Sequence, residues 1–102
     1  MTFGIQLAEA RKKLGLSQKD LASKITKEDG EPISPQYLND IEHDRRNPPA
    51  EEMIYQFAKH LKIDAEILFY LSGKLPQELK NAQAEPEKIV AAYQAFRKAL
   101  KK

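Results

Sequence analysis

The chain has 102 residues, enough for one domain with a single small core and at most a short extension. Its 17 Lys and Arg residues and 15 Asp and Glu residues give a formal net charge of +2, which neither requires nor excludes a polyanionic partner. The absence of cysteine excludes a disulfide framework and thiolate metal sites, and no segment has a signal-peptide core or approaches about 20 consecutive apolar residues. We therefore expect a soluble cytoplasmic protein.

The first predicted helix covers residues 3–14. Its apolar side chains are spaced four, three and four residues apart, as on one face of a helix, at Phe3, Leu7, Ala10 and Leu14. Thr2 can cap its N-terminus, and Gly15 can adopt the left-handed conformation that ends many helices.

A second, shorter helix is predicted over residues 17–25. Ser17 is an N-cap candidate, and Asp20 can accept from free backbone N–H groups of the first turn. The side chains expected to face the core are Leu21, Ala22 and Ile25. Residues 26–32 are polar, contain a Gly and a Pro and have no periodicity, so they predict a loop.

The segment from Ile33 to Arg46 predicts an exposed recognition helix. Ser34 can cap it, and Pro35 suits its first turn, where a missing N–H costs nothing. A narrow apolar edge, Ile33, Leu38 and Ile41, leaves a polar face of Gln36, Tyr37, Asn39, Asp40 and His43. By itself this pattern is more typical of an ordinary solvated helix than of a binding face. The neighbouring segments are needed to distinguish these two interpretations. Residues 44–49, with Pro48, end the helix.

Two more helices complete the predicted bundle. Residues 50–61 place one apolar face toward the core, formed by Met53, Ile54, Phe57, Ala58 and Leu61. Asp64 can cap the next helix, which stops near Gly73 and whose expected inward residues are Ile67, Leu68, Tyr70 and Leu71. The sequence thus predicts an all-α fold, a compact five-helix bundle over residues 1–73 with no strand signal.

Residues 74–85 predict a connector, and residues 86–102 predict an additional C-terminal amphipathic helix. Its apolar stripe is spaced four, three and four residues apart, at Ile89, Tyr93, Phe96 and Leu100. This helix is too short, at about 25 Å, for a coiled coil of several heptads. The stripe therefore either pairs with its copy in a homodimer, which we favour, or packs back on its own bundle.

Three runs in the first half of the chain carry a family resemblance. Residues 11–22 (RKKLGLSQKDLA), 33–42 (ISPQYLNDIE) and 45–48 (RRNP) follow one another in the order found in the Xre family of Cro-repressor-type helix-turn-helix regulators. The resemblance covers about residues 3–71. It implies that the helix at 17–25 braces against DNA phosphates and that the recognition helix lies in the major groove.

The resemblance also assigns roles to single residues. Gln36, Tyr37 and Asp40 match positions that face base edges, with Asn39 as a weaker candidate. Gln36 can pair with adenine and Asp40 can accept from cytosine N4, whereas Tyr37 can instead pack on sugar and phosphate. The residues matched to phosphate contacts, or lying beside them, are Gln18, Ser17, Lys19, Arg45, Arg46 and Asn47.

Two further features bear on the fold of the motif. The resemblance implies that Arg11 and Glu42 form a structural ion pair between the first helix and the recognition helix. The turn before the recognition helix is usually about four residues long in such motifs, but seven residues separate Ile25 from Ile33 here, three of them acidic. Because loop closure costs little per added residue, the fold should survive. The loop either lies away from DNA, opposes its binding, or contacts a protein.

These observations predict a sequence-specific DNA-binding transcriptional regulator, a repressor that binds an inverted repeat of double-stranded DNA as a homodimer. The alternative is a helical interaction module or an antitoxin that binds a protein partner, with or without DNA autoregulation. His43 and His60 do not form an HExxH motif, and the sequence has no GxSxG, Walker or dinucleotide-binding motif. We therefore expect no enzyme activity, cofactor, metal or membrane partner.

Overall fold

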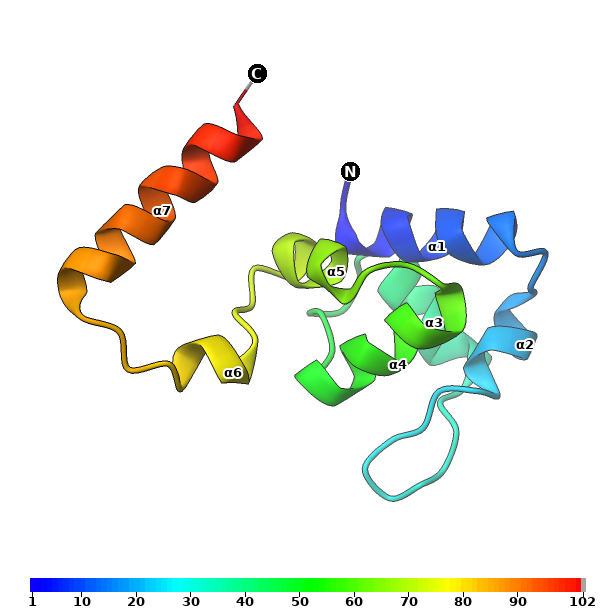
Figure 1. The fold of residues 1–102 in the computed structure, drawn as a ribbon. Coiled ribbons are helices and arrows are strands. Elements are labelled where there is room, and N and C mark those ends of the chain that lie inside the picture. The colour runs from blue at the N-terminus through cyan, green and yellow to red at the C-terminus, as the bar shows by residue number, and fades with distance from the viewer. Residues whose placement is uncertain (102) are drawn as a thin grey trace.

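The computed structural model describes residues 1–101, in which seven helices follow one another along the chain (Figure 1). In that range, β pairing is limited to one antiparallel bridge between Thr26 and Pro32. The predicted all-α fold is confirmed. The helices are α1 (Phe3–Lys13), α2 (Gln18–Ala22), α3 (Pro35–Glu42), α4 (Glu51–Leu61), α5 (Ala65–Ser72), α6 (Gln77–Lys80) and α7 (Pro86–Leu100).

The predicted caps determine where the first three helices begin. Thr2 Oγ1 accepts from the Ile5 N–H at 3.1 Å, and Ser34 Oγ accepts from the Tyr37 N–H at 3.0 Å. Ser17 and Asp20 form a reciprocal capping box, in which each side chain accepts from the other's backbone N–H. These hydrogen bonds satisfy N–H groups that have no partner inside the helix.

Two predicted helices are shorter in the structure. α2 ends at Ala22 instead of Ile25, where the Ser23 hydroxyl donates to the Asp20 carbonyl at 2.7 Å, although Ile25 is still buried. α3 ends at Glu42 instead of Arg46, because Asp44 adopts a left-handed conformation with φ of 57°. This conformation redirects the chain, so that Arg45 and Arg46 turn back toward α3.

The core lies among α1 to α5. Its fully buried large side chains come from all five helices and the segments between them, namely Leu7, Leu21, Ile25, Leu38, Ile41, Ile54, Phe57 and Leu68. Burying each such side chain stabilises the fold by about 1.5–3 kcal/mol. The bundle is thus a rigid support for α3, whose Leu38 and Ile41 are the anchors.

The inward face of α5 differs from the prediction. Ile67 and Tyr70 are 42% and 60% exposed, whereas Phe69 is buried and packs edge-to-face on Tyr55 with ring centroids 5.2 Å apart. Residues 67–71 are apolar or aromatic throughout, so periodicity alone could not determine which side meets the core. Leu14 is also more exposed than predicted, because it lies at the C-cap of α1. Asp64 occupies the N-cap position of α5 but makes no capping side-chain bond.

The predicted loop at 26–32 is a closed hairpin that projects from the bundle between α2 and α3 (Figure 1). The Lys27 N–H donates to the Glu31 carbonyl at 2.8 Å, and the Ile33 N–H donates to the Ile25 carbonyl at 2.9 Å. Gln56 of α4 holds its base: Oε1 accepts from the Thr26 N–H at 2.7 Å, and Nε2 donates to the Thr26 carbonyl at 3.0 Å. The seven residues of this loop therefore close on themselves before α3 begins.

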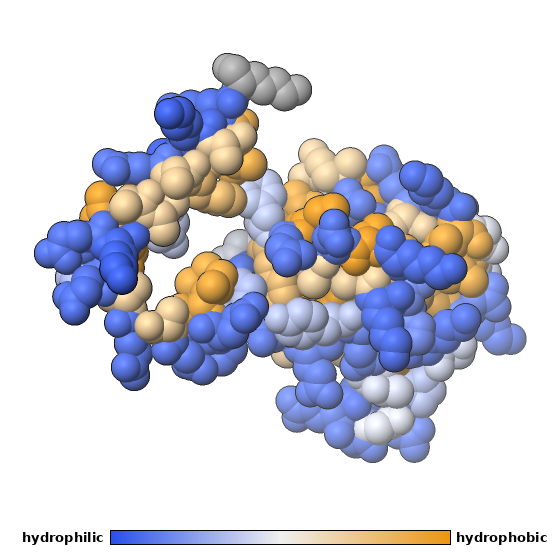
Figure 2. Space-filling model, viewed as in Figure 1, coloured by the Kyte–Doolittle hydropathy of each residue, from blue (hydrophilic) through white to orange (hydrophobic). Residues whose placement is uncertain are grey.

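α7 extends beyond the bundle at the end of the connector (Figure 1). The connector contains the short helix α6, whose Gln77 N–H donates to Glu51 Oε1 of α4 at 2.8 Å. α7 has no buried residue, and its apolar atoms reach the surface (Figure 2). Tyr70 of α5 and Phe96 meet edge-to-face with ring centroids 6.0 Å apart. Among the described residues, no helix has both the length and the apolar character needed to cross a membrane.

Candidate nucleic-acid interface

α3 presents a polar face from a firmly anchored helix. Leu38 and Ile41 are buried, whereas Gln36 is exposed and Tyr37, Asn39 and Asp40 are partly exposed. The four side chains predicted to face bases are Gln36, Tyr37, Asn39 and Asp40, and all of them reach the surface. A helix fixed on one side and polar on the other can enter a DNA groove without rearrangement of its backbone.

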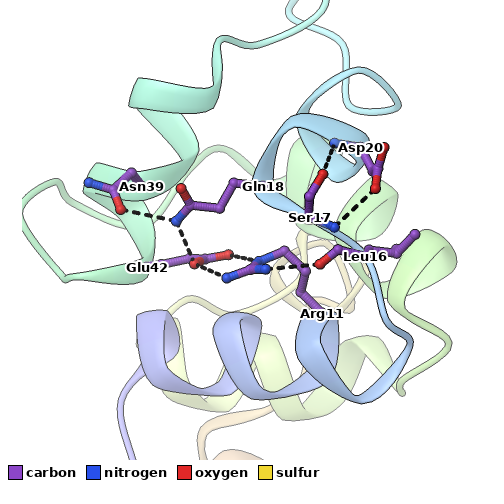
Figure 3. A network of polar contacts seen from close by, with 7 residues as sticks. All are labelled: Arg11, Leu16, Ser17, Gln18, Asp20, Asn39 and Glu42. Atoms are coloured by element: carbon purple, nitrogen blue, oxygen red, sulfur yellow. Dashed lines mark hydrogen bonds and ion pairs between the residues drawn. The ribbon is translucent and has the colours of Figure 1, made fainter.

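An ion pair joins α1 to the end of α3, as the sequence predicts. Arg11 Nε and Nη2 donate to Glu42 Oε2 and Oε1 at 2.7 and 2.9 Å, and the two residues are only 8% and 6% exposed (Figure 3). Arg11 Nη1 also donates to the Leu16 carbonyl at 2.9 Å. The hydrogen bond to Glu42 raises the pKa of Arg11 above its ordinary value, although burial opposes this. The bidentate geometry offsets the cost of removing two charges from water.

Gln18 is directed into this network, and not outward as a phosphate donor. Its Nε2 donates to Glu42 Oε1 at 2.9 Å and to Asn39 Oδ1 at 3.0 Å (Figure 3). The Glu42 carboxylate can only accept, so it fixes the orientation of the Gln18 amide. Both amide hydrogens are used in these two contacts, whereas the resemblance implies that this amide donates to a phosphate. Asn39 keeps its own Nδ2 group as a donor.

A second polar cluster covers the outer face of α3 and the residues that follow it. Asp40 Oδ1 accepts from Gln36 Nε2 at 3.0 Å and from Arg45 Nε at 3.2 Å, and Arg46 Nε lies 3.6 Å from Oδ2. The Arg46 guanidinium carbon is 4.9 Å from the centroid of the Tyr37 ring. The fold thus brings together three predicted base-contact residues and two predicted phosphate-contact residues.

The electrostatics of this cluster favour an ionised Asp40. Desolvation acts to raise the pKa of Asp40, but hydrogen bonds from Arg45 and Gln36 and the charges of Arg45 and Arg46 outweigh it. The net effect holds the pKa below the ordinary value for an aspartate. Asp40 therefore carries its negative charge within the proposed interface at neutral pH.

The other residues predicted to contact phosphates lie on the surface. Ser17, Lys19 and Asn47 are all exposed. Ser17 Oγ accepts the Asp20 N–H at 2.9 Å, so its hydroxyl lies at the start of α2. The predicted groups are therefore accessible, with the exception of the amide hydrogens of Gln18.

Asp44 is an organising residue that the sequence patterns did not reveal. Its Oδ1 accepts from the Gly4 N–H at 2.9 Å and its Oδ2 accepts from the Thr2 hydroxyl at 2.6 Å. A Cβ at Gly4 would lie 2.5 Å from the carbonyl oxygens of both Ile41 and Glu42. A glycine inside a predicted helix was the available signal, because it often marks a close approach of two backbones.

The 26–32 hairpin lies beside α3. A groove of about 480 Å³ separates the two, lined by Lys27, Pro32, Ile33, Ser34, Tyr37, Arg46 and Met53. Lys27 and Arg46 give this groove two cationic groups, one from the hairpin and one from the end of the recognition segment. The acidic residues of the hairpin, Glu28, Asp29 and Glu31, are exposed.

Comparison with solved structures identifies two similar chains. The first belongs to a crystal structure of the master regulator for biofilm formation SinR in complex with DNA, with 24% identity, a TM-score of 0.55 and coverage of 67% of this chain and 98% of that chain. The second comes from a complex of the SinR and SinI proteins, with 20% identity, a TM-score of 0.56 and coverage of 96% of this chain and 99% of that chain. At these identities the likeness establishes the fold. No curated protein sequence matches the chain.

The family match covers the segments that build the interface. The helix-turn-helix family model matches residues 7–68, which extend from α1 into α5 and include both polar networks around α3. Proteins of this type are DNA-binding regulators and not enzymes. The chain therefore belongs to the Xre-type helix-turn-helix family.

Proposed function

We propose that the protein is a sequence-specific transcriptional repressor that binds double-stranded DNA in the cytoplasm. The observation that carries this proposal is the polar face of α3, held on the bundle by Leu38, Ile41 and the buried Arg11–Glu42 pair. Residues 1–73 would form the DNA-binding domain, residues 74–85 the connector and residues 86–102 the dimerisation segment. One of the two SinR structures is a complex with DNA, which supports the same ligand for this chain.

In this proposal α3 lies in the major groove and its side chains contact base edges. Gln36 donates to and accepts from adenine, Asp40 accepts from an amino group, and Asn39 uses its free Nδ2 donor. Arg45, Arg46, Asn47, Lys19 and Ser17 contact phosphates on either side of the groove. Gln18 acts indirectly, because it fixes Asn39 and Glu42.

The test is enrichment of a random-sequence duplex pool at physiological salt, followed by binding measurements on the selected site. Gln36→Ala should reduce discrimination at one base pair by about 1–3 kcal/mol. Gln94→Ala is the matched control, since Gln94 is an exposed helical glutamine on α7. Failure of any sequence to enrich, or equal effects of the two variants, would contradict the proposal.

We further propose that the repressor is a homodimer joined through α7. The stripe of Ile89, Tyr93, Phe96 and Leu100 is about half exposed along its whole length, and its ring contact with α5 leaves most of that surface open. Burial of such a stripe against a second copy would remove it from water. Two-fold symmetry would then place the half-sites of an inverted repeat about 34 Å apart, or a multiple of that distance.

Light scattering on the full chain and on a chain ending at Glu85 tests this arrangement. The full chain should have twice the mass expected from its sequence, and the shortened chain should be monomeric. A shortened chain that stays dimeric would place the contact within the bundle instead. Lys88→Ala, an exposed change on the same helix, should leave the dimer intact.

The C-terminal region also supports a second candidate function, binding of a protein partner. The structure of SinR with SinI aligns with 96% of this chain, including the region beyond the helix-turn-helix match. The apolar surface of α7 could therefore take a different chain, as in an antitoxin or a regulated adaptor. Affinity capture with and without competing DNA separates the two functions, because a pure adaptor retains a protein and selects no DNA sequence.

A further inference from the structure

Asp40 lies at the centre of the groups that would contact DNA. One of its carboxylate oxygens accepts from Gln36 and Arg45, and the other faces Arg46. The side chain of Asp40 is 20% exposed, whereas those of Arg45 and Arg46 are 55% and 54% exposed. The carboxylate is thus largely covered by the same side chains that must turn outward to reach a base or a phosphate.

These contacts alter what the two arginines can offer to a phosphate. A guanidinium pairs most strongly with an oxyanion through two parallel N–H groups. Arg45 Nε donates to Asp40 Oδ1 at 3.2 Å and Arg46 Nε lies 3.6 Å from Oδ2, so the Nε side of each guanidinium is held near Asp40. The nearby negative charge also offsets part of the attraction of the arginines for the DNA backbone. The arginines can offer their Nε side to a phosphate only after they leave Asp40.

Release of the arginines has a cost that depends on the DNA sequence. Once the side chains of Arg45, Arg46 and Gln36 turn away, the ionised carboxylate of Asp40 lies next to negatively charged DNA without its hydrogen-bond donors. Removing a carboxylate from water costs much free energy if no other group replaces its hydrogen-bond donors. In the major groove, only the amino groups of cytosine (N4) and adenine (N6) can replace those donors. Guanine and thymine present acceptors at the corresponding places and would repel the carboxylate.

We propose that Asp40 is the main selectivity residue of the interface, because it competes with phosphates for Arg45 and Arg46 and releases them only beside a base with a major-groove amino group. This inference rests on the proposed DNA-binding function and adds a mechanism to it. Non-specific DNA is bound weakly because the arginines stay on Asp40. The selected site is bound tightly because cytosine or adenine takes their place.

The test compares Asp40→Asn with Glu28→Gln on the selected site and on a random duplex over a range of salt concentrations. Both variants remove one negative charge, but Glu28 is exposed in the hairpin and, among the described residues, makes no hydrogen bond or ion pair with Arg45 or Arg46. Asp40→Asn should raise affinity for the random duplex roughly three- to tenfold more than Glu28→Gln does, as expected for two freed arginines. Its salt slope on random DNA should steepen by about one to two. The ratio of selected to random affinity should fall for Asp40→Asn and stay constant for Glu28→Gln.

A measurement without DNA tests the contact itself. In the free protein, the Nε–H proton of Arg45, which donates to Asp40, should exchange with solvent more slowly than in Asp40→Asn, as followed by NMR. Equal exchange in both proteins would overturn the proposal. So would equal random-duplex affinities and slopes for Asp40→Asn and Glu28→Gln, even if the wild type selects a clear DNA site. If the wild type selects no site while the NMR contrast is present, the DNA-binding function itself fails, and the selectivity role fails with it.

Discussion

The amide of Gln18 donates to Glu42 Oε1 at 2.9 Å, the same oxygen that accepts from Arg11 Nη2. One carboxylate thereby connects α1, the start of α2 and the end of α3. The relative placement of the two helices in the motif depends on this shared acceptor as well as on the apolar core. A change at Glu42 should therefore alter both stability and the orientation of α3.

Removal of one partner from the buried ion pair should be costly. We expect Arg11→Met to lower the free energy of unfolding by about 3–5 kcal/mol, because Glu42 would remain buried without its counter-charge. Denaturant unfolding monitored by circular dichroism measures this change. Lys12→Met is the matched control, since Lys12 is the exposed neighbour in the same helix. A loss as small as that of the control would show that solvent reaches Glu42 readily.

Gly4 should be intolerant of even the smallest side chain. In Gly4→Ala the new Cβ would lie 2.5 Å from two carbonyl oxygens of α3, so α1 and α3 must separate. We expect a destabilisation of about 1–3 kcal/mol, as for an overpacked core. Gly15→Ala is a useful contrast, because nothing lies within 4 Å of the position its Cβ would take and only the left-handed φ of 72° is strained. Gly15→Ala should cost about 1 kcal/mol, and a larger loss than in Gly4→Ala would contradict the close-approach argument.

The capping box at the start of α2 should make stability depend on pH. The backbone and side-chain hydrogen bonds from Ser17 lower the pKa of Asp20 below its ordinary value. A carboxylate with a lowered folded pKa stabilises the protein above its unfolded pKa of about 3.9, and this contribution is lost as the pH falls through the folded value. The melting temperature should therefore fall less steeply below about pH 4 in Asp20→Asn than in the wild type. Ser17→Ala should flatten the same part of the profile, and an unchanged profile in both variants would exclude the capping box as its source.

The base of the 26–32 hairpin should depend on Gln56. Loss of its three hydrogen bonds to Thr26 in Gln56→Ala should speed amide hydrogen exchange at Lys27 and Ile33, while exchange in α1 stays slow. Gln6→Ala, a partly exposed glutamine on α1, serves as the control. If exchange in the hairpin is unchanged, the backbone pairing closes the loop without help from α4.

Local sequence signals predicted most of the helix boundaries. Ser17, Ser34 and Gly73 act within one turn of the chain, so their effects are visible in a short window of sequence. The anchors Leu38 and Ile41 follow from periodicity for the same reason. The ordered motif of residues 11–48 indicated the family correctly.

The partners of individual polar side chains could not be predicted in this way. Gln18 can donate to a phosphate or to Glu42, and only the three-dimensional placement of α2 beside α3 decides between them. The Asp40 cluster depends on the left-handed turn at Asp44, which brings Arg45 back along α3. Whether Phe69 or Tyr70 faced the core was likewise a property of tertiary packing.

Hydrogen bonds close the 26–32 hairpin at its base, so the side chains at its tip can be changed without altering the fold of the motif. Residues 28–30 are exposed, and nothing lies within 4 Å of the position that a Cβ at Gly30 would take. Since the sequence contains no cysteine, Glu28→Cys would introduce a single thiol that can carry a fluorophore. Energy transfer from the labelled hairpin tips to a dye at one end of a duplex would then report how far the tips lie from that end, and thus where the protein binds along the duplex.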